Sequence, residues 1–334
     1  MSSPLVLTQG DPAGIGPELA LMAWLARSTW PTAPFIAAIH PELLRETARR
    51  LNLTVPITVV EPEEAAAVFP AALPVLDGMD AVSVAPGRPD PATAGATLAS
   101  IDRAVALVHA GRASAVVTNP ISKSVLYAAG FAHPGHTEYL GVLAERLWGA
   151  PARPVMMLWS TLLAVVPVTI HIPLAQVPAA LTEDLIVETG RIVARDLAAR
   201  FGLPRPRLAF AGLNPHAGED GAIGTEEVTV VRPAIARLAA EGLDVRGPLP
   251  ADTMFHPPAR GRYDVALCMY HDQALIPIKT LAFDDGVNVT LGLPFVRTSP
   301  DHGTAFDIAG KGIARPDSLL AALALAGRIA GSNL

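Results

Sequence analysis

Short aliphatic runs alternate with longer Ala- and Leu-rich stretches along most of the chain. Runs such as "PLVLT", "PFIAAI" and "RLAFA" have the length of buried strands, whereas residues 181–201 keep one apolar face at helical spacing. Strands that alternate with helices are typical of α/β folds with a mostly parallel sheet. The pattern therefore predicts an α/β protein.

Polar residues mark the ends of the predicted helices. Thr182 is placed to cap the helix over residues 181–201, and Gly202 follows as a terminator. Pro17 and Glu18 suit the first turn of another helix, because proline lacks the N–H that this position leaves unpaired and an acid favours the positive end of the helix.

The longest apolar run covers residues 154–174 and is interrupted by Ser160, Pro167 and His171. A membrane span needs about 20 apolar residues without such breaks. We therefore expect two buried strands joined by a turn near residues 159–161.

The predicted strand ends carry the polar residues that chemistry needs. They read "TQGDPAG", "TNPISK", "TIHIPL", "GLNPHAGEDG" and "MYHDQ". Ligands of parallel α/β sheets bind beyond the carboxyl ends of the strands, so these endings map a candidate site.

Three histidines, His171, His216 and His271, each follow a strand-like run, at separations of 45 and 55 residues. These separations match no compact zinc motif, so one interpretation is that each imidazole only caps a strand end. The alternative is a metal site, because all three would gather at one edge of the sheet. Asp252 and Asp272 add carboxylates that could serve as ligands, partners of ligands or bases, or as loop caps.

Other motifs have two interpretations each. "GDPAGIGPE" is a tight strand-to-helix turn or a phosphate-binding loop, and its glycines do not match the dinucleotide fingerprint. "HPGHTEYL" places His136 and Thr137 at a helix start, which favours an anion, although Thr137 could be only a cap. Lys279, Asn288 and Arg297 follow one another at intervals of nine residues. The two cations among them suggest an oxyanion partner, and the alternative is that both are solvated surface cations.

Composition narrows the class of protein. The 334 residues are 51% hydrophobic and carry a net charge of −6 without a basic stripe, which argues against nucleic-acid binding. The one cysteine, Cys268, lies in an apolar run and is expected to be buried and reduced. The N-terminal segment lacks a targeting pattern, so we expect a cytoplasmic location and no membrane partner.

Taken together, these segments resemble the 4-hydroxythreonine-4-phosphate dehydrogenase family of pyridoxal phosphate synthesis. The matching motifs run in order from residue 10 to about residue 312 and include "GHTEYL", "GPLPADTMF" and "MYHDQALIPIK". The resemblance implies a divalent metal (Zn, Mg or Co) held by His171, His216 and His271. It also implies substrate contacts from His136, Thr137, Lys279, Asn288 and Arg297.

The same resemblance implies a homodimer whose active sites lie at the subunit interface. It implies two lobes like those of isocitrate and isopropylmalate dehydrogenases, with the active site in the cleft between them. One lobe would comprise residues 1–125 plus 275–334, and the dimerising lobe residues 126–274.

The segment "HGTAFDIAGKG" is similar to the adenosine-binding loop of those dehydrogenases. This similarity implies cofactor contacts from His302, Gly303, Thr304 and Asp307. Asp307 would meet the ribose 2′-hydroxyl and repel a 2′-phosphate, which predicts NAD in preference to NADP.

The expected reaction oxidises C3 of 4-phosphohydroxy-L-threonine, and the resulting β-keto acid then loses CO2. Asp272 and Asp252 are the first candidates for the proton acceptor, and His136 is another. Three alternatives remain at this point. They are a sister dehydrogenase acting on 4-phospho-D-threonate, D-erythronate or a dihydrodiol dicarboxylate, a metal-dependent phosphoester hydrolase, and a non-catalytic binding protein.

Overall fold

The computed structural model describes residues 3–30 and 32–331. The chain forms two compact units, Met1–Pro154 with Leu293–Leu334 (unit 1) and Val155–Gly292 (unit 2). These boundaries differ from the expected positions near residues 125 and 274. The reason is packing: the helix at His136–Trp148 packs in the core of unit 1, and the helix at His271–Leu281 packs in the core of unit 2.

Unit 1 contains six parallel strands in the order β3-β4-β2-β1-β5-β12. Their bounds are β1 Leu5–Thr8, β2 Phe35–Ala38, β3 Ile57–Val60, β4 Leu73–Leu76, β5 Ala115–Val117 and β12 Arg297–Pro300. The helices are α1 Gly16–Leu25, α2 Pro41–Arg50, α3 Ala65–Val68, α4 Ala94–His109, α5 Lys123–Ala128, α6 His136–Trp148 and α12 Asp317–Ile329.

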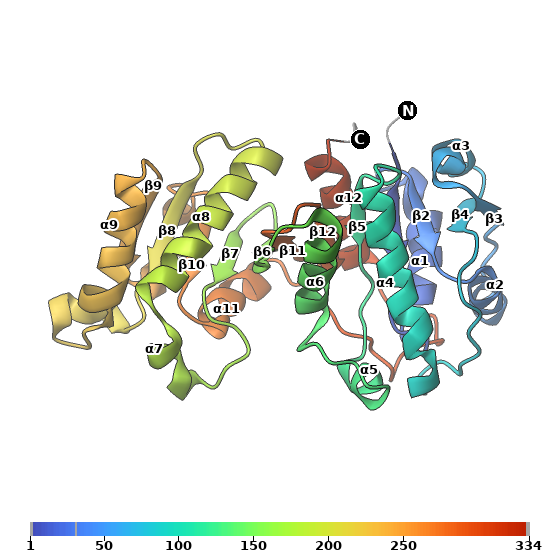
Figure 1. Ribbon diagram of the computed structural model, residues 1–334, viewed down its shortest axis with the longest axis horizontal. Coiled ribbons are helices and arrows are strands. Elements are labelled where there is room, and N and C mark those ends of the chain that lie inside the picture. The colour runs from blue at the N-terminus through green and yellow to red at the C-terminus, as the bar shows by residue number, and fades with distance from the viewer. Residues whose placement is uncertain (1–2, 31, 332–334) are drawn as a thin grey trace. The chain divides into compact units, whose positions relative to one another are not determined.

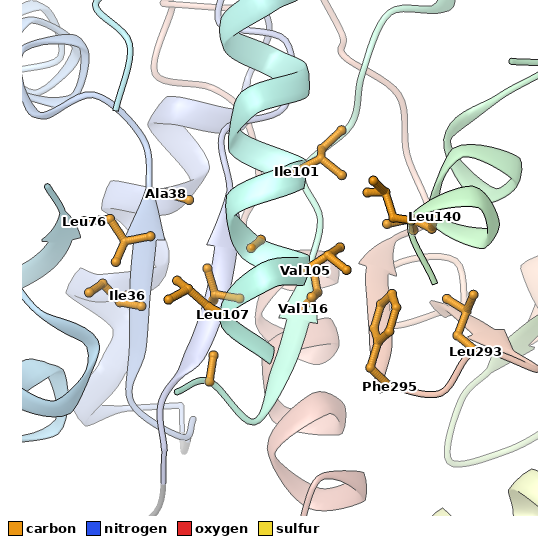
Figure 2. Close-up of a cluster of buried hydrophobic side chains, with 14 of the residues drawn as sticks. Ile36, Ala38, Leu76, Ile101, Val105, Leu107, Val116, Leu140, Leu293 and Phe295 are labelled. Atoms are coloured by element: carbon orange, nitrogen blue, oxygen red, sulfur yellow. The ribbon is translucent and has the colours of Figure 1, made fainter. Parts of the chain in front are cut away.

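Aliphatic side chains alternate between the two faces of this sheet. Figure 2 shows Ile101 and Val105 of α4 directed toward Leu140 of α6 and toward Phe295. Ile36 of β2 belongs to the same buried cluster. In Figure 1, α4 and α6 lie over one face of the strands, and α1 and α12 lie behind them.

Unit 2 has six strands in the order β11-β6-β7-β10-β8-β9, of which β7, β10, β8 and β9 are parallel neighbours. They are β6 Val155–Trp159, β7 Ala164–Pro167, β8 Arg207–Ala211, β9 Asp244–Leu249, β10 Val265–Cys268 and β11 Val287–Leu291. Its helices are α7 Val177–Ala180, α8 Glu183–Arg200, α9 Arg232–Ala240, α10 Pro257–Arg260 and α11 His271–Leu281.

Opposite faces of unit 2 are covered by different helices. Ala274 and Ile278 of α11 pack with Ala209 of β8 in one buried cluster. Gly190 of α8 approaches the ring of Phe210, the next residue along β8, so α8 covers the other face.

Several local predictions are confirmed. The α/β class and the mostly parallel strands are as expected, and the apolar run over residues 154–174 contains the antiparallel strands β6 and β7. The Thr182 hydroxyl accepts a hydrogen bond from the Leu185 N–H at 3.2 Å and so caps α8. Cys268 is fully buried, and burial raises the pKa of its thiol, which makes it an inert core residue.

The segment after β10 differs from the expected strand end. Residues from His271 onward form the 11-residue helix α11, although Pro277 lies inside it. Proline normally interrupts a helix, and the sequence pattern had indicated only a strand end here. In residues 3–30 and 32–331, no helix is both long and apolar enough to cross a membrane.

Candidate active site

The three predicted metal ligands follow three neighbouring strands of unit 2. His171 comes after β7, His271 after β10 and His216 after β8, and β10 pairs in parallel with both of the others. Parallel pairing sends all three carboxyl ends to the same edge of the sheet. Asp252 follows β9, the next parallel strand, and lies at the same edge.

Two of the three imidazoles lie close together. The ring centroids of His171 and His271 are 5.6 Å apart, and both side chains line a cavity of about 260 Å³. Asp272 shares this cavity, and its Oδ1 lies 2.7 Å from Nδ1 of His271. A carboxylate on Nδ1 orients the ring and leaves Nε2 for another partner, as is usual for metal-binding histidines.

His216 begins a strained loop. Residues 216–220 all have positive φ, with values of 51°, 53°, 77°, 41° and 54°, and only Gly218 among them is a glycine. Left-handed backbone at non-glycine residues costs about 1 kcal/mol or more each and persists only where the surroundings impose it. His171 also has a positive φ, of 49°.

A buried carboxylate imposes the His216 loop. Glu227 is 0% exposed and accepts hydrogen bonds from the backbone N–H of Asn214 at 2.7 Å and from its side-chain amide at 2.9 Å. A Cβ on Gly218 would lie 2.5 Å from Glu227 Oε2, so only glycine fits there. The sequence alone did not identify Glu227 as part of the candidate site.

The remaining unit 2 candidates lie on three elements. Asp252 is in a short turn, Lys279 is two turns along α11 with Nζ 5.9 Å from the centroid of the Phe283 ring, and Asn288 is on β11. Lys279 is thus carried by a helix.

Imidazole nitrogens with a nearby carboxylate suit a divalent metal of the zinc or cobalt class. Across the described part of the chain, no three His, Cys, Asp or Glu side chains gather closely enough to hold an ion. The fold therefore brings His171 and His271 together and places His216 on the adjacent loop. The donor types fit a metal, and the His216 side chain is exposed.

Unit 1 contains a second polar cluster, around Arg297. Its guanidinium is buried and donates to the Thr118 hydroxyl from Nε at 3.1 Å and from Nη2 at 2.6 Å. Burial lowers the pKa of Arg297 to about 10, so it stays charged at neutral pH. Burial, and then the positive charge of Arg297, hold the pKa of His136 well below its usual range.

His136 is the first residue of α6, and its buried Nε2 has no hydrogen-bond partner in the part of the chain described. A neutral imidazole there is free to accept a hydrogen bond or a proton from a ligand. Thr137 is the second helical residue, and the N-cap is Gly135 without a side-chain hydrogen bond, so the suggested capping role of Thr137 is wrong.

The predicted nucleotide loop follows β12. His302, Gly303, Thr304 and Asp307 lie at the same sheet edge as the loops after β1 and β5, because these three strands are parallel neighbours. The Asp307 side chain is exposed, and Ile15 donates its N–H to the Thr304 carbonyl at 3.0 Å.

Comparison with known proteins gives the family. The model of the pyridoxal phosphate biosynthetic protein PdxA matches residues 31–326. A 4-hydroxythreonine-4-phosphate dehydrogenase of Methylorubrum extorquens is 64% identical over 329 residues, covering 98% of this chain and 94% of that protein. The chain belongs to the 4-hydroxythreonine-4-phosphate dehydrogenase family.

Solved structures agree with this family assignment. The crystal structure of the Klebsiella pneumoniae 4-hydroxythreonine-4-phosphate dehydrogenase has a TM-score of 0.87 and 38% identity, over 98% of this chain and 100% of that one. A terephthalate dihydrodiol dehydrogenase of Burkholderia xenovorans is more distant, with a TM-score of 0.66 and 28% identity over the full length of both chains. The family predicted from the motifs is confirmed.

The sequence did not identify Lys123 as a candidate site residue of this 4-hydroxythreonine-4-phosphate dehydrogenase family member. A Cβ on Gly135 would lie 3.2 Å from Nζ of Lys123, so the ammonium group lies beside the start of α6. Lys123 ends the quoted motif "TNPISK", and its position after a strand was the available signal.

The low pKa of His136 predicts a pH-dependent stability. The unfolded chain protonates this imidazole near pH 6.5 and the folded chain does so only at lower pH, so the free energy of unfolding should fall as pH drops below 6.5. Between pH 7.5 and 5.5, His136→Gln should lose about 1 kcal/mol less than the unmodified protein, as measured by urea unfolding. His256→Gln controls for loss of a surface imidazole, and equal pH slopes for the His136→Gln and unmodified proteins would contradict this assignment.

Proposed function

We propose that the protein oxidises C3 of 4-phosphohydroxy-L-threonine with NAD in pyridoxal 5′-phosphate biosynthesis. The product, 2-amino-3-oxo-4-(phosphooxy)butanoate, then loses CO2 to give 3-amino-2-oxopropyl phosphate. The observation that supports this proposal most is the placement of three histidines after three adjacent parallel strands in a member of this family.

His171, His216 and His271 would hold one divalent metal, either Zn, Co or Mg. When bound, such a metal polarises a substrate hydroxyl and makes it more acidic. The hydroxyl proton then passes to a nearby base while hydride leaves C3 for the nicotinamide. Asp272 is our first candidate for that base because it lies against His271, and Asp252 lies at the same sheet edge. His136 is the third candidate, because its low pKa keeps it unprotonated.

The substrate phosphate would be bound by cations. Arg297 in unit 1 is charged, buried and rigidly held by Thr118, which suits recognition of an oxyanion. His136 and Thr137 open α6, whose first turn presents backbone N–H groups to an anion. Lys279 and Asn288 in unit 2 complete the proposed contacts, and Lys123 is a further candidate.

His302, Gly303, Thr304 and Asp307 would bind the adenosine part of NAD. A carboxylate accepts a hydrogen bond from a ribose 2′-hydroxyl and repels a 2′-phosphate. The exposure of Asp307 supports this role.

The protein would act as a homodimer through unit 2. Ile276 of α11 is 64% exposed, Phe283 just beyond it is 75% exposed, and Leu174 is 66% exposed. Exposed large apolar side chains are the type of residue that interaction surfaces use.

A sister dehydrogenase activity is the second candidate function. The similarity to a dihydrodiol dehydrogenase supports it only weakly, since that structure is the more distant match. Measuring NADH formation with 4-phospho-D-threonate and with a dihydrodiol dicarboxylate would distinguish the two. A phosphoester hydrolase would instead release phosphate without NAD.

The metal proposal predicts a chelator-sensitive enzyme. Dialysis against a strong chelator should abolish NADH formation from 4-phosphohydroxy-L-threonine, and Zn²⁺, Co²⁺ or Mg²⁺ should restore it. His216→Ala should lower both bound metal, by elemental analysis, and kcat by at least about a hundredfold. If His216→Ala lowers only the Tm, this imidazole is a loop cap.

The nucleotide proposal predicts a change in cofactor preference. Asp307→Asn keeps the shape of the side chain and removes its charge, so kcat/KM should fall about tenfold for NAD and rise for NADP. Initial rates with each cofactor at saturating substrate give the ratio. An unchanged NAD to NADP ratio would exclude Asp307 from ribose recognition.

The dimer proposal predicts a concentration-dependent mass. Light scattering at micromolar concentration should give twice the chain mass of 34.8 kDa for the unmodified protein. Phe283→Asp should shift the mass toward one chain, because a charge at a buried apolar contact is costly. Val59→Ser, an exposed apolar site in unit 1, is the control, and a monomeric unmodified protein would refute the proposal.

A further inference from the structure

Glu18 is a buried carboxylate that the reaction proposed above does not use. It lies in the first turn of α1 and is 1% exposed. Its Oε2 accepts a hydrogen bond from the Gly310 N–H at 2.8 Å, and its Oε1 has no hydrogen-bond partner in the described chain. A buried carboxylate with one donor is costly to desolvate, so the single bond that it makes is a strong structural constraint.

Gly310 lies near the end of the loop that carries Asp307. Ala305 has φ 45° and Gly310 has φ 73°, so the loop turns through left-handed backbone on both sides of Asp307. Two backbone hydrogen bonds between residues three apart lie within it, from Ile308 N–H to the Ala305 carbonyl and from Lys311 N–H to the Ile308 carbonyl. Such a compact turn needs anchors to the scaffold if its exposed carboxylate is to have a fixed position.

The two ends of this loop are tied to the same segment of unit 1. At its start, Ile15 donates to the Thr304 carbonyl, and a Cβ on Gly14 would lie 2.8 Å from that oxygen. At its end, Glu18 accepts from Gly310. Residues 14–18 therefore hold the loop from both sides, through one main-chain bond and one side-chain bond.

The second anchor is tightly enclosed. A Cβ on Gly310 would lie 2.8 Å from the side chain of Pro86, so the loop end is pressed against a neighbouring segment. The cavity that Glu18 and Gly310 line with Arg50 and Pro86 is only about 20 Å³. That volume admits about one water molecule.

We propose that Glu18 is a positioning residue for NAD, which acts by fixing the loop that presents Asp307 to the ribose. This inference rests on the proposed nucleotide-binding role of that loop. Glu18 itself touches no part of the cofactor in this account. Loss of its hydrogen bond should therefore weaken cofactor binding without altering the handling of substrate.

The test compares three variants of the full-length enzyme. Glu18→Ala should raise KM for NAD about tenfold and leave kcat and KM for 4-phosphohydroxy-L-threonine within about twofold. Glu18→Gln should restore most of the NAD affinity, because its amide oxygen can still accept from Gly310. Glu46→Ala removes an exposed carboxylate that lines the same cavity and should behave like the unmodified protein.

Hydrogen exchange gives a readout that does not depend on turnover. In Glu18→Ala the amides of residues 303–312 should exchange at least about tenfold faster, while those of α1 keep their protection. If Glu18→Ala does not fold, Gly310→Ala tests the same anchor from the loop side, since its Cβ would meet Pro86. That variant should then show the NAD-selective rise in KM.

The outcomes separate this inference from the function on which it rests. If Asp307→Asn alters cofactor preference and Glu18→Ala alters neither KM for NAD nor exchange of the loop, the role of Glu18 is refuted and the function stands. If neither variant affects NAD, the loop is not the nucleotide site and both proposals fall. A parallel rise in KM for NAD and substrate would also refute a selective positioning role.

Discussion

The parallel pairing of β7, β10 and β8 is the constraint on which the candidate metal site depends. Antiparallel neighbours would send alternate strand ends to opposite edges and separate His171, His216 and His271. The same rule operates in unit 1, where β1, β5 and β12 bring the Gly10–Glu18 turn and the loop of Asp307 to one edge. His171 and His271 thus become neighbours without a compact sequence motif, and His216 follows the adjacent strand.

Buried carboxylates fix the loops at both edges. Glu227 holds the Asn214 backbone before the left-handed run of His216, and Glu18 holds Gly310 after Asp307. A loop cannot pair all of its N–H groups with itself, and a carboxylate accepts such donors more strongly than a neutral group. The left-handed backbone at His171 and His216 is strained, and such strain persists only where the surrounding structure imposes it.

Electrostatics at the start of α6 follow from burial. Arg297 remains charged inside unit 1 because burial lowers its pKa only to about 10, and burial together with this charge keeps His136 neutral. At one pH, the fixed cation Arg297 can bind an oxyanion and the unprotonated imidazole of His136 can accept a proton.

The sequence alone determined the fold class, the Thr182 cap, the buried Cys268 and the family, because each depends on local periodicity, composition or ordered motifs. It also located the strand ends where the candidate residues lie. The tertiary structure decided what depends on contacts between distant residues. It continued α11 through Pro277 because the helix packs on the sheet, excluded Thr137 as a cap, and revealed Lys123, Glu227 and Glu18. No local pattern distinguishes a carboxylate that faces solvent from one that holds a loop almost 300 residues away, since only the folded chain brings donor and acceptor together.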